Sequence, residues 1–571
     1  MTCGVKLSLA LAALILFTTP PVHAQNFAWA AQATSNSGGS GDEVQVVGTD
    51  AIGNVYSAGI FWGTIDLDPG AGVFTVTGPG SDYDIFVQKL DPSGNFIWGF
   101  SIGSSQFETV NDIYVEPSGD FYLTGFFPGG MDFDPGVGNT TLSGNGVRDI
   151  FIAKYTSSGN FVFANGMGSS LSDQAETITL DGSGNIYIGG LFRSTVDFDP
   201  GAGTANLTAV GNWDMFLAKY DPSGNYLWAF AVGGANYEAV TAVTIGNTGD
   251  VLVTGYFDGP NMDFDPGAGS ALLSTNGSYD AFVASYTSAG AFNWAKRVGG
   301  TLDDQGMGIV SNGSGDIFVT GGFKGTNVDF DPGVGSFPLT ASDKDIFILK
   351  LDAAGNFGWA KKIGGGAEEV GVDMALDPLG NLCITGVFEG SVDFDPDGGV
   401  VLLAGQGGYD IFVGSYSNAG ALNWARSMGG TGSELTRGIC TDGSGSVYTV
   451  GLFYQTVDFN TDAGTLNFTA INGSDGFLHK LSTGTTGIQV QMAGDLKIYP
   501  NPTADIVTVE LNQSHHSVEA SLTDITGKIL LNRTLSDINS FQIDMAPLPP
   551  ATYFLKVTTE TGTTATKLTK Q

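Results

Sequence analysis

The chain has 571 residues, of which 42% are apolar and 86 are glycine, and its formal net charge is −36. Length and apolar content suffice for two or more domains with large cores, while a glycine content about twice the ordinary level favours short strands and turns over long helices. Such an acidic surface disfavours nucleic acid and anionic membranes as partners, because binding phosphate needs positive charge.

The first residues have the features of a secretion signal. Lys6 precedes an apolar run from Leu7 to Phe17, and a small residue, Ala24, ends the segment before Gln25. The run is too short to span a bilayer, and its ending suits signal peptidase. We therefore predict a signal peptide at residues 1–24 and an exported mature chain with no membrane span.

A short acidic segment, "TVDFDPGAG" at Thr195–Gly203, recurs in seven copies at intervals of 64 to 66 residues. We call these copies the slots. Around each slot lie four apolar runs separated by turn signals such as "DPSGN" and "DGSGN", which predict antiparallel strands joined by tight turns. Several runs are apolar on both faces, as expected for strands covered above and below. Seven four-stranded units of this kind predict an all-β, seven-bladed β-propeller.

The two ends of the repeat region complement each other. The segment "NFAWAA" from Asn26 matches the strand "NFIWGF" from Asn95 that ends a unit, whereas the last unit stops one strand short after "DGFLHKLS". We expect the N-terminal strand to complete the last blade and close the ring, which leaves no exposed sheet edge.

The repeat unit also resembles a known family. The strand "DIFVQKL" from Asp84, the strand "NFIWGFSIGSS" and the hairpin "DGSGNIYIGG" are similar to the seven-bladed β-propeller (SBBP) repeat family over residues 25–484. This resemblance implies the propeller fold. It implies no single activity, because one fold hosts many functions.

A polar linker at residues 485–494 separates the repeats from a tail at residues 495–571, whose alternating apolar residues predict a small Ig-like β-sandwich. The tail resembles the type A C-terminal sorting domain of the type IX (Por) secretion system. The matching residues are Tyr499, Pro500, Asn501, Pro502, Gly527, Tyr553, Lys567 and Lys570. The resemblance implies that the type IX machinery carries the protein across the outer membrane of a Gram-negative bacterium, and that it is then released or attached to the surface.

The slot aspartates have three interpretations. They can accept backbone hydrogen bonds in Asx-turns, with the intervening phenylalanine buried as a plug. They can bind Ca²⁺ through hard carboxylate oxygens. They can also serve as paired catalytic carboxylates of a polysaccharide-degrading enzyme. We expect them to ring one face of the propeller, together with seven further aspartates that end each connection, the first of which is Asp84. The slot residues are Asp66, Asp68, Asp132, Asp134, Asp197, Asp199, Asp263, Asp265, Asp329, Asp331, Asp393, Asp395 and Asp458.

Positions that differ between repeats are the candidate ligand-binding residues. They flank the slot connection on both sides and include many aromatic and basic residues, types that are favoured at binding surfaces. Unconstrained surface drift is the alternative explanation. The candidates are Trp62, Tyr83, Arg148, Arg193, Trp213, Tyr279, Lys324, Lys344, Tyr409 and Tyr454.

These observations favour a non-enzymatic binding, adhesion or scaffold protein, secreted or held on the outer surface of a Gram-negative cell, with glycans or surface proteins as partners. The alternatives are a secreted polysaccharide-degrading enzyme and a Ca²⁺-stabilised structural protein. The enzyme is less favoured, because His479 is the only histidine in residues 25–494 and the slot acids repeat in step with the fold.

Overall fold

The computed structural model describes residues 25–35, 41–80, 82–462, 464–483, 496–499, 506–524, 528–549, 552–559 and 562–570. The chain forms two compact units, Met1–Thr483 and Gly484–Gln571. The predicted signal peptide and the predicted linker lie outside the described residues.

The first unit consists of seven antiparallel, four-stranded blades. The first three blades are β2 (Glu43–Thr49), β3 (Val55–Trp62), β6 (Tyr83–Leu90) and β7 (Phe96–Ile102); β8 (Thr109–Val115), β9 (Phe121–Phe127), β12 (Asp149–Tyr155) and β13 (Phe161–Met167); and β14 (Gln174–Leu180), β15 (Ile186–Phe192), β18 (Asp214–Tyr220) and β19 (Tyr226–Val232).

The next three blades are β20 (Ala239–Ile245), β21 (Val251–Phe257), β24 (Asp280–Tyr286) and β25 (Phe292–Val298); β26 (Gln305–Ser311), β27 (Ile317–Lys324), β30 (Lys344–Leu351) and β31 (Phe357–Ile363); and β32 (Val370–Leu376), β33 (Leu382–Phe388), β36 (Asp410–Tyr416) and β37 (Leu422–Gly430). The seventh blade is β38 (Leu435–Thr441), β39 (Val447–Asp458), β40 (Asn467–Thr483) and β1 (Gln25–Ala33).

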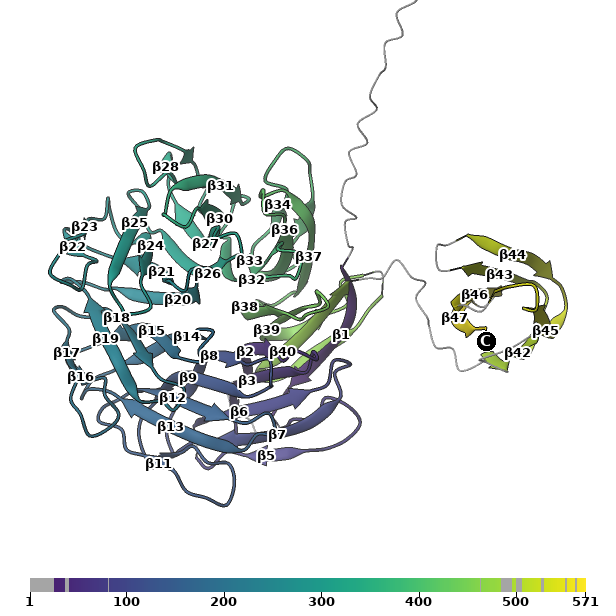
Figure 1. Cartoon of the computed structure of the whole chain (residues 1–571), viewed down its shortest axis with the longest axis horizontal. Coiled ribbons are helices and arrows are strands. Elements are labelled where there is room, and N and C mark those ends of the chain that lie inside the picture. Colours follow the sequence, from purple (N-terminus) through teal and green to yellow (C-terminus); the bar gives the residue numbers. More distant parts are fainter. Residues whose placement is uncertain are drawn as a thin grey trace, which may run out of the picture. The chain divides into compact units, whose positions relative to one another are not determined.

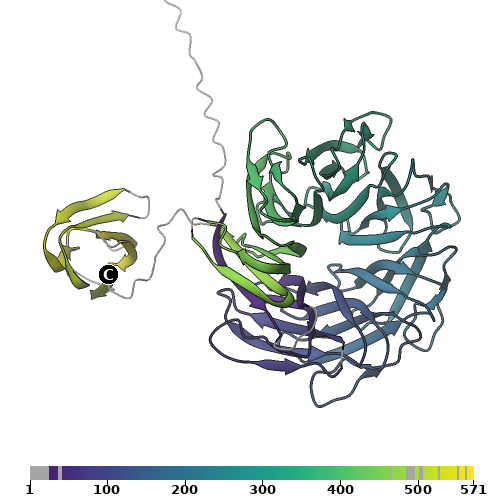
Figure 2. The same ribbon diagram turned by 180° about the vertical axis from the view of Figure 1, so that it is seen from behind.

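The seven blades form a closed ring. The first strand of each blade lies innermost and contacts the first strands of both neighbouring blades, and β38 contacts both β32 and β2 (Figures 1 and 2). The ring is sealed by β1, which pairs antiparallel with β40 from Gln25↔Thr483 to Ala33↔Gly476. The predicted all-β, seven-bladed propeller, with the N-terminal strand completing the last blade, is confirmed.

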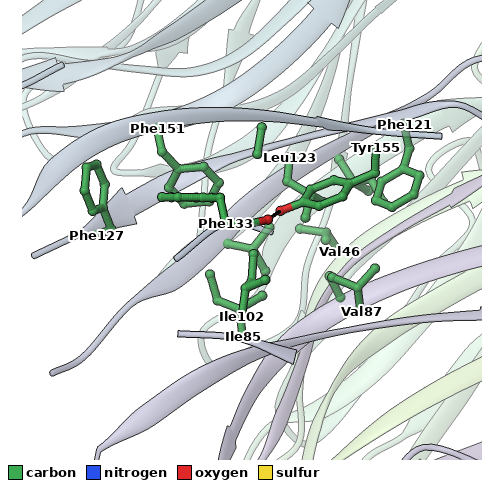
Figure 3. Packing of buried hydrophobic residues seen from close by; sticks show 14 of the residues in the cluster. Val46, Ile85, Val87, Ile102, Phe121, Leu123, Phe127, Phe133, Phe151 and Tyr155 are labelled. Carbon is green, nitrogen blue, oxygen red and sulfur yellow. Dashed lines mark hydrogen bonds between the residues drawn. The ribbon is translucent and has the colours of Figure 1, made fainter. Parts of the chain in front are cut away.

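Packing between blades explains the strands that are apolar on both faces. Every residue of β9, β15 and β33 is buried, because a neighbouring blade covers each face of these second strands. Figure 3 shows one such junction, where Val46 and Ile85 of the first blade pack against Phe121 and Leu123 of the second. Seven apolar clusters of this kind line the ring.

Each slot lies in the long connection between the second and third strands of a blade and pairs with a short strand of the same connection. In six of the connections the two strands form a separate hairpin, and in the seventh blade they are extensions of β39 and β40. The described hairpin strands are β4 (Thr64–Asp66), β5 (Thr75–Thr77), β10 (Met131–Asp132), β11 (Thr141–Leu142), β16 (Thr195–Asp197), β17 (Asn206–Thr208), β22 (Met262–Asp263), β23 (Leu272–Leu273), β28 (Val328–Asp329), β29 (Pro338–Leu339), β34 (Ser391–Asp393) and β35 (Leu402–Ala404).

The second unit is a β-sandwich, as the sequence predicts. One sheet has the order β41-β42-β45 and the other β44-β43-β46-β47, and apolar residues of both sheets, among them Val507, Phe541 and Leu555, form one core. Its strands are β41 (Leu496–Tyr499), β42 (Ile506–His515), β43 (Val518–Asp524), β44 (Ile529–Leu535), β45 (Ile538–Asp544), β46 (Thr552–Thr559) and β47 (Gly562–Thr569).

Candidate functional site

The slot aspartates make the same backbone hydrogen bonds in every repeat. In the third blade, Oδ1 of Asp197 accepts from the backbone N–H groups of Asp199 and Ala205 at 3.1 and 2.7 Å, and Oδ1 of Asp199 accepts from Gly201 at 2.8 Å. The other six slots repeat this pattern, and Asn460 takes the second position in the last. One oxygen of each aspartate therefore holds the loop, as expected for an Asx-turn.

The residue between the two aspartates is the buried plug that the sequence predicts. Phe133 is fully buried against Phe127 and Phe151, and the hydroxyl of Tyr155 donates to its carbonyl at 2.8 Å (Figure 3). In the last blade the ring of His479 bonds to the equivalent carbonyl, and burial lowers the pKa of this histidine to about 4. The only histidine of the repeats thus serves packing.

The structure corrects the expected position of the slots. Residues 134–136 lie in a groove of about 400 Å³ beside Trp98 and Phe100 of the preceding blade's outer strand, and a matching groove of about 410 Å³ holds residues 68–72 beside Trp29. The slots begin near one face and then follow the outer wall between neighbouring blades. In the second and seventh blades the slot pairs with the end of the preceding blade's outer strand, in Gly103↔Asp132 and Gly429↔Asp458. They therefore do not ring one face.

Ca²⁺ binding at the slots stays a prediction. Within the described ranges, no group of three or more His, Cys, Asp or Glu side chains is arranged to hold a metal ion. Calcium usually takes six to eight oxygen ligands. At a slot, the backbone N–H groups already use one oxygen of each aspartate.

The aspartates that end the connections are buried. Each is at most 2% exposed, and six of the seven accept hydrogen bonds from their own loop, as Asp214 does from Val210 at 2.8 Å. They lie where third strands begin, and we call that side of the propeller the rim face. The seven are Asp84, Asp149, Asp214, Asp280, Asp345, Asp410 and Asp475.

A second acid faces each of these aspartates, and the sequence analysis missed it. It stands just before or at the start of the next inner strand, and each of its seven copies is also at most 2% exposed. The signal was available, because an acid recurs at this place in every repeat, as in "NYEAV" and "GSELT". The seven are Asp42, Glu108, Asp173, Glu238, Asp304, Glu369 and Glu434.

These acid pairs favour the protonated state. The pKa of Glu238 is raised to about 8, mainly by burial and also by the neighbouring Asp214 and Asp258, while a backbone hydrogen bond from Gly234 opposes the rise. At two junctions the protein supplies a cation instead, since Arg297 contacts Asp280 and Lys362 contacts Asp345, both at 2.7 Å. The pairs fix the junctions between blades, and seven similar copies point to a structural role.

The candidate ligand-binding residues occupy positions that lie in pairs on the rim face, one pair beside each connection. The two flanking positions form cross-strand pairs, as in Trp62↔Tyr83, whose rings meet edge to face at 5.4 Å. Arg193 likewise lies 5.2 Å from the ring centre of Trp213. The structure thus brings together positions that are about 20 residues apart in sequence, as expected for residues flanking one hairpin connection.

The structure extends these residues into two clusters of ring and cation contacts, one on the first and second blades and one on the third and fourth, which together we call the aromatic arc. Four of its ten members were not predicted: Phe107 and Tyr237 just precede the inner strands β8 and β20, and Phe126 and Tyr256 lie in the second strands β9 and β21. Neighbouring rings are 5.4 to 6.2 Å apart, and Arg148 lies 4.3 Å from the ring centre of Phe126. The arc consists of Trp62, Tyr83, Phe107, Phe126, Arg148, Arg193, Trp213, Tyr237, Tyr256 and Tyr279.

The remaining candidates lie apart from the arc, on the fifth to seventh blades. Lys344 contacts Glu368 at 4.0 Å, and the hydroxyl of Tyr409 donates to the same carboxylate at 3.1 Å. Lys324 contacts Asp343 at 3.5 Å. Tyr454 is 39% exposed and joins no aromatic cluster among the described contacts.

A β-bulge in every inner strand forms a second set of varied positions. The register shifts by one residue at the same place in all seven inner strands, as between Val110 and Asp112 of β8, which sets one residue per strand at the central channel. We call these residues the bulge ring. They are Gln45, Asn111, Glu176, Thr241, Met307, Val372 and Arg437.

Two predicted sorting residues hold the sandwich together. The hydroxyl of Tyr553 donates to the carbonyl of Pro549 at 2.7 Å, and the ammonium group of Lys570 donates to the carbonyls of Met545 and Ala546 at 2.6 and 3.2 Å. Both residues thus hold the segment that precedes β46. Of the other predicted sorting residues, Tyr499 lies in β41 and Lys567 in β47, while Pro500, Asn501, Pro502 and Gly527 lie outside the described residues.

Comparisons with known proteins address both units. Residues 497–571 match the family of secretion system C-terminal sorting domains. An uncharacterized WD repeat-containing protein of Acanthamoeba polyphaga mimivirus is 25% identical over 458 residues, covering 66% of this chain, and the regulatory protein FlaEY of Caulobacter vibrioides is 21% identical over 411 residues, covering 69%. The chain spans 33% and 41% of the length of these two relatives.

These matches agree with the structure. WD repeats form propeller blades, so the first relative fits the observed ring. Among the described residues, no helix has the length and hydropathy needed to cross a bilayer. The chain is a β-propeller repeat protein that carries a type IX sorting domain at its C-terminal end, and it is exported by that secretion system to the cell surface or beyond.

Proposed function

We propose that the protein is a non-enzymatic binding module that acts outside a Gram-negative cell, after loss of residues 1–24, and binds its ligand on the rim face. The observation that carries this proposal is the aromatic arc. It gathers eight aromatic side chains and Arg148 and Arg193 on one face, and all of these except the buried Phe126 are partly exposed to solvent.

The chemistry of the arc favours glycans as ligands. Aromatic rings present flat apolar surface at little conformational cost, and tyrosine hydroxyls add hydrogen-bonding groups at the edge. The residues of the arc stand at positions that differ from repeat to repeat, while the blade that carries them is the same. A repeat fold can change residues at such positions without losing stability. A surface protein with exposed aromatic or acidic residues is the second class of partner that fits.

Retention on insoluble polysaccharides tests the proposal. We expect the triple substitution of Tyr83, Trp213 and Tyr279 by alanine to abolish retention, because it removes rings from both ends of the arc. The matched control is Leu227→Ala, which trims a side chain that is 47% exposed on the outer strand β19. Equal retention of the triple variant and the unaltered protein on every matrix that binds would refute the rim face as the binding surface.

A further inference from the structure

The centre of the propeller contains a cavity of about 680 Å³ that residues from all seven inner strands line. Small-molecule sites in proteins typically have volumes of about 300–1,000 Å³ and combine apolar walls with a few fixed polar groups. The bulge ring supplies the chemistry of this cavity, because it sets one side chain of each strand at the channel.

The bulge ring is polar on one side and apolar on the other. Its planar polar members come from four consecutive blades, the seventh, first, second and third, whereas the fifth and sixth blades contribute Met307 and Val372. A cavity with this division suits a ligand that has one hydroxyl-rich edge and one C–H face. The four planar members are Arg437, Gln45, Asn111 and Glu176.

Hydrogen bonds between blades fix these polar groups in place. Oε1 of Gln45 accepts from the hydroxyl of Thr109 at 2.8 Å, and Nδ2 of Asn111 donates to the carbonyl of Ala175 at 2.8 Å. Arg437 bonds to Glu43 at 3.1 Å. Groups held in this way lose little conformational freedom when a ligand binds.

A chain of hydrogen bonds links the lining of the cavity to the aromatic arc. Arg148 donates to Gln174 at 3.4 Å, and Gln174 in turn donates to Glu176 of the bulge ring. The carboxylate of Glu176 also lies near enough to Tyr237 and Tyr256 to raise the pKa of both, although burial is the larger cause in each case. Arc residues of the second and fourth blades therefore lie close to Glu176 of the bulge ring.

We propose that the central channel binds the end of a neutral saccharide chain whose following units lie on the aromatic arc. Amide, carboxylate and guanidinium groups are planar and can bond two neighbouring hydroxyls of a sugar at once, while Met307 and Val372 contact its C–H face. The acids Asp112, Glu176 and Asp373 line the same cavity and disfavour anionic sugars. This inference rests on the proposed binding function and adds the ligand class and the position of the chain end.

Isothermal titration of the purified full chain tests the inference. The probes are neutral oligomers of glucose, xylose, mannose and N-acetylglucosamine, with oligomers of galacturonate as the anionic comparison. Asn111→Ala removes one polar group of the channel, and Val372→Phe fills the channel from its apolar side without touching a polar group. The control Ile97→Ala trims a side chain that is 45% exposed on the outer strand β7.

We expect at least one neutral oligomer to bind, Asn111→Ala and Val372→Phe each to weaken that binding tenfold or more, and the control to leave it unchanged. If both channel variants bind like the unaltered protein while Trp213→Ala abolishes binding, the channel inference is wrong and the arc alone is the site. Tighter binding of galacturonate than of neutral oligomers also overturns the inference. If none of these probes binds, the saccharide ligand class fails for both channel and arc.

Discussion

The slots and the bulge ring show opposite behaviour within the same repeat. All seven slots make the same three backbone hydrogen bonds and bury an equivalent apolar plug, while the seven members of the bulge ring are seven different residue types. The slot is copied because each blade needs it to seal the junction with its neighbour. The bulge ring faces the channel, where each blade places a different residue type at the same position of the fold.

This contrast separates stability from binding. A substitution at a position that all repeats share should lower the free energy of unfolding, and one at a varied position should leave it nearly unchanged. The four predictions below test that separation, in order of their expected effect on the free energy of unfolding.

The largest effect is expected at a plug. Phe198 is fully buried, with ring centres 5.6 Å from Phe192 and 4.9 Å from Phe216. Phe198→Ala should lower the free energy of unfolding by about 3–5 kcal/mol, because it leaves a cavity between blades. Denaturant titration measures this loss. Val210→Ala, at an exposed residue of the same connection, is the control and should change little.

A smaller effect is expected at the slot acid Asp197. Removal of its acceptor oxygen in Asp197→Ala should cost about 1–2 kcal/mol, because the N–H groups of Asp199 and Ala205 lose their partner. Asp197→Asn keeps an acceptor oxygen and should lose much less.

The same pair of variants tests calcium at the slots. If the slots bind Ca²⁺, a chelator should lower the melting temperature of the unaltered protein, and Asp197→Asn should reduce that response by weakening one of the sites. If the melting temperature does not change when chelator is added, Ca²⁺ does not stabilise the protein through the slots.

The third prediction concerns pH. The pKa of Glu238 is raised from 4.5 to about 8 by burial, so the stability of its protonated form is fully present below pH 4.5 and is lost as the pH rises through about 8. The groups facing it are Asp214 and Asp258. Glu238→Gln cannot ionise, so it should raise the free energy of unfolding at pH 8.5 by on the order of 1 kcal/mol and have little effect at pH 4.

Thermal melts of the unaltered protein and the Gln variant across this range measure the difference. Glu389→Gln, at a partly exposed acid of the same side of the ring, is the control and should show the same pH profile as the unaltered protein. A Glu238→Gln variant that is less stable at both ends of the range would show that the acid pair is needed in its ionised form.

The smallest effect on stability is expected in the arc. Trp213 is partly exposed, and Trp213→Ala should change the free energy of unfolding by at most about 1 kcal/mol while reducing ligand retention. Comparing the denaturant midpoint with retention separates the two effects. If Trp213→Ala lowers the free energy of unfolding by several kcal/mol, Trp213 stabilises the fold in the same way as the positions that all repeats share.

The fold could be predicted from the sequence because each expected strand and turn can be compared with its copies in the other repeats. Strands, turns and the closing pair of ends each recur at fixed spacing, and the burial of strands such as β15 follows from residues that are apolar on both faces. The plug at Phe133 was predicted for the same reason: an apolar residue between two polar ones must point the other way.

The sites were harder to predict, because they depend on where the backbone turns. The slot segments run down the outer wall, where those of the second and seventh blades pair with a strand of the preceding blade, and spacing within one repeat contains no information about that pairing. The bulge ring depends on a one-residue register shift between paired strands, which leaves no mark on residues as different as Asn111 and Met307. The binding role of either set remains a prediction.

The pairing of β1 with β40 has a kinetic consequence. Paired residues of the two strands are more than 440 positions apart in the sequence, so the last hydrogen-bonded ladder forms only after all repeats have been synthesised. Joining such distant segments is slow, since the entropy of closing a long loop is lost before the contacts form. Until then β40 presents an unpaired edge. A chain cut before residue 476 lacks the part of β40 with which β1 pairs. Such a chain should be the form that proteases and chaperones recognise.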